Sequence, residues 1–132
     1  MIRIFLIPVF IFLILGCKTI KPTPVTSETC LKYHTGSFFS ISKKDKDSIF
    51  IERRDSIEII RIPNKMDTTT CKIIWITPCE YKLTVLSSTR RSSWLYDLKC
   101  KIISETEKYH IEYSRVLSGK ESWGFEDKLW FK

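Results

Sequence analysis

From residue 36 onward, apolar and polar residues alternate with period two in short runs. Such alternation is typical of half-buried β-strands and not of helices, whose apolar residues recur every three to four positions. The run CEYKLTV is the clearest, with Cys79, Tyr81, Leu83 and Val85 predicted to point inward. In three further runs apolar residues share a face in pairs: Phe39 with Ile41, Ile49 with Ile51, and Ile57 with Ile59.

Charged and polar clusters separate these runs, at residues 43–47, 53–56, 63–67, 87–93 and 118–121. Short sequential strands enriched in β-branched and aromatic residues predict an all-β antiparallel meander. About seven or eight strands would curl into a small barrel or half-barrel of lipocalin-like type, because closing a sheet removes its vulnerable edges. A two-sheet β-sandwich is the alternative. The sequence has no internal repeat, so residues 30–132 are predicted to form a single β domain.

The N-terminal pattern differs from the rest. Residues 4–15 are an unbroken apolar run of twelve residues after a single positive charge at Arg3. That length fits the apolar region of a secretory signal and is too short to span a bilayer. The run ends in ILGC, which resembles a bacterial lipobox. We therefore expect residues 1–16 to be a signal peptide and Cys17 to carry acyl chains such as palmitate, which anchor a protein to membrane.

The residues after Cys17 indicate where the anchored chain is held. Lys18 stands where an aspartate would signal retention in the inner membrane, so we expect the outer membrane, facing the periplasm. Residues 17–29, rich in Pro and Thr, are predicted to be an extended tether. Removing 16 of the 132 residues leaves 116 and lowers the net charge from +7 to +6. This charge either attracts anionic lipid or cell-wall polymer or only aids solubility, and we expect no nucleic-acid partner.

Five cysteines become an even set once Cys17 is assigned to lipid. The other four suggest up to two disulfides in an oxidising compartment. We do not expect metal binding, because no pair has CxxC spacing and the two histidines lie far apart. In a hairpin turning at residues 77–78, Cys71 would lie opposite Thr84, too far from Cys79 for a disulfide. Two sets of pairings remain open: Cys30–Cys79 with Cys71–Cys100, or Cys30–Cys71 with Cys79–Cys100.

Three segments, CLKYHTGSFF, IFIERRDSIEI and KIIWITPCEYKLTV, resemble a family of short flavobacterial-type lipoproteins of unknown function. The resemblance covers residues 30–85 and implies that Cys30–Cys79 is the shared disulfide, with Cys71–Cys100 as an extra bridge. Some members carry the label "DNA topoisomerase IV". This sequence does not support that activity, because 116 residues cannot hold a catalytic tyrosine domain and an ATP-binding module.

The sequence offers no catalytic motif, Gly-rich phosphate loop or dinucleotide fingerprint. His34 near Cys30 suggests a Cys/His dyad, but a surface histidine beside a disulfide cysteine is the better interpretation. Glu80 is predicted to be a solvated strand residue, and His110 to point outward between Tyr109 and Ile111. We therefore expect no enzyme activity and no cofactor.

Aromatic residues make up 13% of the chain, enough to fill a core or to line a ligand cavity. Trp94 is the exception, because Arg90 and Arg91 precede it in a long polar segment that would suit an anionic surface or a partner protein. We predict a monomeric, membrane-anchored, non-enzymatic module for binding or envelope interaction. The alternative is a lipocalin-like carrier of an apolar ligand.

Overall fold

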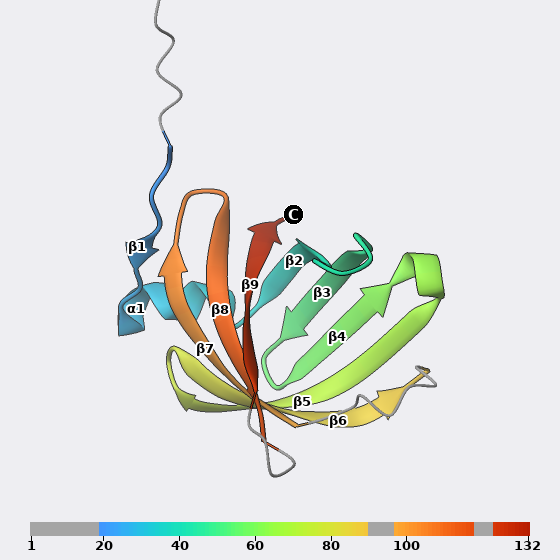
Figure 1. Cartoon of the computed structure of the whole chain (residues 1–132). Coiled ribbons are helices and arrows are strands. Elements are labelled where there is room, and N and C mark those ends of the chain that lie inside the picture. Colours follow the sequence, from blue (N-terminus) through green and yellow to red (C-terminus); the bar gives the residue numbers. More distant parts are fainter. Residues whose placement is uncertain (1–18, 90–96, 118–122) are drawn as a thin grey trace, which may run out of the picture.

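A computed structural model of the chain describes residues 19–89, 97–117 and 123–132. Two short helical turns precede a series of antiparallel strands (Figure 1). The elements are β1 (Thr23–Pro24), α1 (Ser27–Cys30), the 3₁₀ helix η1 (Leu31–Tyr33), β2 (Gly36–Ile41), β3 (Ser48–Arg54), β4 (Ile57–Ile62), the 3₁₀ helix η2 (Pro63–Lys65), β5 (Asp67–Thr77), β6 (Glu80–Ser88), β7 (Leu98–Glu105), β8 (Tyr109–Val116) and β9 (Gly124–Phe131).

The strands form a closed barrel. Each strand from β2 to β9 pairs antiparallel with the next, and β9 returns to pair with β2. Eight of the described strands therefore close on themselves, and β1 adds a short extra strand beside β7. Figure 1 shows this wrapping, with red β9 beside cyan β2. The predicted meander barrel is confirmed, and the alternative sandwich is not formed.

The barrel has two distinct ends. At the first, which we call the α1 end, α1 and η1 lie near the β3–β4, β5–β6 and β7–β8 turns. The β2–β3 and β4–β5 connections lie at the opposite end, which we call the far end. The predicted contact residues Arg90, Arg91 and Trp94, and the predicted lipidation residue Cys17, lie outside the described residues.

Inward and outward faces follow the predicted alternation on some strands and not on others. Tyr81 and Leu83 on β6 are buried, as predicted. On β2, however, Phe38 and Ser40 are the buried residues, so the face that Phe39 shares with Ile41 is the outer one. On β4 the buried residues are Glu58 and Ile62, so the face that Ile57 shares with Ile59 is again the outer one.

The segment predicted as a tether contains a strand and the start of a helix. Thr23 and Pro24 pair with Glu105 and Ser104 of β7. Thr26 then caps α1: its hydroxyl accepts from the Thr29 amide at 3.3 Å, and the Thr29 hydroxyl accepts from the Thr26 amide at 2.9 Å. This reciprocal capping box starts the helix at Ser27. Residues 23–24 and 27–29 of the segment predicted as a tether therefore form regular structure.

The cysteines form one of the two predicted bridges in the described chain. Cys30 and Cys79 are joined, with Cα atoms 5.2 Å apart, so α1 is fixed to the β5–β6 turn. The predicted Cys71–Cys100 bridge is wrong, because both residues are buried free thiols. Cys71 pairs with Val85 and Cys100 with Tyr81, on opposite sides of β6. They are two strands apart, about 10 Å, and offset by about 13 Å along the strands, beyond disulfide reach.

The β5–β6 register also differs by one residue from the prediction. Thr84 lies opposite Lys72, and Cys71 lies opposite Val85. The turn lies one residue later than predicted, because Thr77 pairs with Glu80, and this alone would displace the register by two residues. One extra residue on β5, between Trp75 and Thr77, reduces the displacement to one residue as far as Cys71.

Candidate functional site

A buried arginine organises the interior at the α1 end. The Arg53 side chain is completely shielded from solvent. Its Nε donates to Glu58 Oε2 at 2.7 Å, and its Nη2 donates to the Tyr81 hydroxyl at 2.8 Å. Its Nη1 donates to the Tyr33 carbonyl at 3.0 Å and to Glu112 Oε1 at 3.1 Å. Burying a charge is costly unless it is paired and hydrogen-bonded, and Arg53 meets both conditions.

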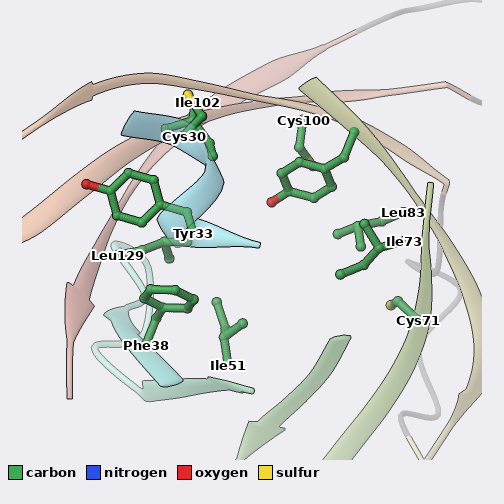
Figure 2. Packing of buried hydrophobic residues seen from close by; sticks show 11 residues of the cluster. Cys30, Tyr33, Phe38, Ile51, Cys71, Ile73, Leu83, Cys100, Ile102 and Leu129 are labelled. Atoms are coloured by element: carbon green, nitrogen blue, oxygen red, sulfur yellow. The ribbon is translucent and has the colours of Figure 1, made fainter. Parts of the chain in front are cut away.

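The same guanidinium spans the barrel. Its central carbon lies 5.4 Å from the Phe38 ring centroid on β2 and 4.8 Å from the Tyr81 ring centroid on β6. In the order of the closed sheet, β2 and β6 are four strands apart and so lie on opposite walls. Figure 2 shows core side chains pointing inward from both sides, Phe38 and Ile51 from one and Ile73 and Leu83 from the other. At this level, therefore, protein atoms fill the interior.

Glu112 is the second centre of the network. Its Oε2 accepts from the Tyr81 hydroxyl at 2.5 Å, and its Oε1 accepts from His110 Nε2 at 2.9 Å. Burial acts to raise the pKa of Glu112, but the charge of Arg53 and the hydrogen bonds from His110 and Tyr81 lower it to about 2. The carboxylate is thus ionised at every physiological pH.

Glu58 behaves in the opposite way. Burial is the largest effect and raises its pKa, the nearby Arg53 charge opposes this, and the negative charge of Glu112 raises it further. Two carboxylates that share one guanidinium cannot both be stabilised fully as anions. Arg53 therefore keeps the Glu112 carboxylate ionised, whereas Glu58 takes up a proton more readily than an ordinary glutamate.

The predicted surface position of His110 is wrong. This residue is fully buried, with its ring centroid 4.2 Å from that of Tyr33 and 5.1 Å from that of Phe38. Because ionised Glu112 can only accept a hydrogen bond, His110 Nε2 carries the proton between them. Its Nδ1 has no hydrogen-bond partner in the described part of the chain. The inward face of β8 is set by the Glu112–Arg53 pair, which brings His110 inside with it.

Sequence reasoning missed this network, although one signal for it was present. Ile49, Ile51 and Arg53 are every second residue of β3 and so share one face. The predicted inward face of this strand therefore already included the charged Arg53. For Glu58 the pattern was ambiguous, since β4 has two isoleucines on each face. For Glu112 no signal existed, since an apolar-inside rule turns Tyr109 and Ile111 inward instead.

The other candidate residues have structural partners. The His34 ring stacks on Trp75 at 3.5 Å between centroids, and its Nε2 donates to the Pro78 carbonyl at 2.8 Å. Its neighbour Cys30 is in the disulfide, so the two do not form a dyad. Glu80 lies on the outer face, as expected, 3.3 Å from the Lys101 ammonium.

A groove of about 380 Å³ follows the seam between β2 and β9. These two strands pair only through Phe38 with Phe131 and Phe39 with Trp130, whereas β2 and β3 share six residue pairs. Beyond the two pairs the strands separate and leave the groove, whose lining includes Ile41, Lys43, Asp127, Lys128 and Trp130. Burial raises the pKa of Asp127, while the nearby Lys43 charge lowers it.

The two parts differ in what they can do chemically. Arg53, Glu58 and Glu112 are each at most 5% exposed and contact one another, so a substrate cannot reach them. The seam groove is open and carries both charged and apolar side chains. Among residues 19–89, 97–117 and 123–132, no cluster of three or more His, Cys, Asp or Glu side chains is arranged to hold a metal ion. In the same residues, no helix is long and apolar enough to cross a membrane.

Comparisons with known proteins give no relative for this chain. A scan against protein-family models, a search of curated proteins and a search of solved structures each found no match.

Proposed function

We propose that this chain is a lipid-anchored, non-enzymatic binding module of the bacterial envelope, held through Cys17 at the periplasmic face of the outer membrane and acting as a monomer. One observation carries the binding assignment. The fully buried charged side chains inside the barrel satisfy one another, so they serve the fold. The groups free to meet a partner are on the outer surface, at the seam groove and the faces beside it.

The anchor is supported by the sequence. An apolar run at residues 4–15, whose last two residues begin the motif ILGC, combines a secretory signal with a cysteine in the position of lipidation. Anchoring of this kind suits a small barrel that acts by contact, because it raises the local concentration of the module at the membrane. The oxidising compartment that the anchor implies agrees with the Cys30–Cys79 disulfide.

The anchor is tested by growing cells that express the full chain with an alkyne fatty acid and detecting label on the purified protein. Wild type and the matched control Thr19→Ser are expected to carry the label, and Cys17→Ser to lack it. Unlabelled wild-type protein, or label that persists in Cys17→Ser, contradicts lipidation at this residue.

A carrier of an apolar ligand is a second candidate, favoured by a different observation. Four aliphatic side chains on the inner face toward the far end are only half-buried: Ile49, Ile60, Val85 and Leu98. Inward-facing aliphatic surface that the protein does not cover could hold a hydrocarbon chain.

Solvent extraction of the purified chain separates the two functions. If the protein is a carrier, the wild type releases about one equivalent of lipid. Ile60→Trp, which fills the inner space, should then release less lipid, and the outward-facing control Ile74→Trp should release as much as wild type. A surface-acting module releases no stoichiometric lipid from any of the three proteins.

A further inference from the structure

Four aromatic side chains form a continuous row on the outside of the barrel. They occupy paired positions on neighbouring strands: Phe50 faces Phe39, Phe39 faces Trp130, and Trp130 faces Tyr109. The Trp130 ring centroid lies 4.6 Å from that of Tyr109 and 6.3 Å from that of Phe39. All four are half-buried, whereas a sheet face turned to water is normally polar.

Lysines flank this outer aromatic row. The Lys128 ammonium lies 5.0 Å from the Tyr109 ring centroid, and the Lys132 ammonium lies 5.3 Å from that of Phe50. Both lysines are exposed, as is Lys108 in the β7–β8 turn. Aromatic rings beside lysines are the combination found where proteins enter the headgroup region of a bilayer, the rings at the interface and the ammonium groups at the phosphates.

The path of the N-terminal segment places this row toward the membrane. Thr23 pairs with Glu105 on β7, and Glu105 pairs with His110, the neighbour of Tyr109 on β8. By this register Thr23 lies level with the Tyr109 end of the row, and β1 is three strand spacings, about 15 Å, from β9. Six residues from Cys17 to Thr23 reach at most about 20 Å. The barrel is therefore held close to its anchor.

We propose that the outer aromatic row, with Lys128 and Lys132, is a contact site for anionic phospholipid headgroups, so that the anchored barrel lies on the membrane with β8, β9, β2 and β3 facing it. The site deepens the proposed function and rests on its anchor. The positive ammonium groups match the negative phosphates, and the rings supply apolar area that enters the interface. The seam groove adjoins the row at Trp130 and offers space for a headgroup.

The test uses the full chain reconstituted in vesicles that contain brominated phosphatidylglycerol, with tryptophan emission as the readout. Bromine quenches a tryptophan only at the bilayer. Emission from wild type and from the control Trp123→Phe is expected to be quenched, and Trp130→Phe is expected to lose most of that quenching. Trp123 is a matched control because it is 46% exposed and lies just before β9, at the opposite end of that strand from Trp130.

Charge is tested in a second arm. Each lysine near an anionic surface contributes favourable free energy to membrane binding. The double substitution Lys128→Gln with Lys132→Gln is therefore expected to lower the ratio of docked to undocked barrel roughly 30-fold. The control pair, Lys72→Gln with Lys82→Gln, lies on the outer face of β5 and β6 and should leave quenching unchanged.

The two proposals fail in different ways. Chain that does not float with vesicles contradicts the anchor. Chain that floats without quenching of Trp130 overturns the contact site, and so does equal quenching in brominated phosphatidylcholine. If Trp130 is shielded only when an envelope protein is added, and not by vesicles alone, the row is a contact site for a protein partner and the lipid proposal is overturned.

Discussion

Replacing Glu112 with glutamine tests the buried network most sharply. The substitution keeps the size and most hydrogen bonds of the side chain and removes its negative charge. The pKa of Glu112 falls from 4.5 to about 2 in the folded protein. A shift of this size corresponds to roughly 3 kcal/mol of stability at pH 7, at about 1.4 kcal/mol per pKa unit. We expect Glu112→Gln to lose about that much free energy of unfolding.

The loss should depend on pH with a definite sign. Because the folded pKa of Glu112 is depressed, its stabilisation is complete above the unfolded pKa and is lost as pH falls toward the folded one. The difference between wild type and Glu112→Gln should therefore shrink by more than half between pH 7 and pH 3. Glu58→Gln should show the opposite dependence, because the pKa of Glu58 is raised and its wild-type contribution declines as pH rises.

Urea unfolding followed by tryptophan fluorescence, with the disulfide intact, measures these differences at both pH values. Glu52→Gln is the matched control: it lies next to Arg53 on β3 but on the outer side, where it pairs with Arg61 and Arg54. Its substitution should change the unfolding midpoint little, since exposed ion pairs contribute little. A Glu112→Gln loss as small as the control's, or one that is equal at pH 7 and pH 3, would refute the reasoning.

Two further predictions concern the cysteines. Burial raises the pKa of both Cys71 and Cys100 to about 12, so iodoacetamide at pH 8 should modify neither thiol until denaturant is added, as counted by mass spectrometry; rapid modification in native buffer would contradict their burial. The Cys30–Cys79 bridge closes a span of 49 residues, so Cys30→Ala with Cys79→Ala should lower the free energy of unfolding by about 4 kcal/mol; an unchanged urea midpoint would show that the bridge does not stabilise the domain.

The sequence predicted the fold class because that depends on local patterns. Alternation in short runs, separated by charged turns, identified the strands, and β6 showed its inward face correctly through Tyr81 and Leu83. Closure followed from the cost of leaving strand edges open.

The interior charges could not be predicted in the same way. Glu58 points inward because Arg53 is there to bind it, and Arg53 is stable inside because Glu58 and Glu112 both accept from it. Each position makes sense only with its partner, and the partners are far apart in sequence. Applied strand by strand, an apolar-inside rule therefore cannot choose between the two faces of β4, and it places His110 on β8 on the wrong side.

The prediction of a Cys71–Cys100 bridge failed for a similar reason. Counting cysteines gave an even set of four, and an even set suggests two bridges. Pairing depends on which strands are neighbours, and β6 separates the two thiols.

Native mass spectrometry of the chain, extracted gently from membranes, tests the central claim of a lipid-anchored, surface-acting module most directly. The account predicts a monomer that begins at Cys17, carries covalent acyl chains and holds no lipid inside the barrel. A chain that begins at Met1 without acyl chains would contradict the anchor. A non-covalent lipid bound at one equivalent that Ile60→Trp abolishes would contradict a surface-acting module and establish the carrier instead.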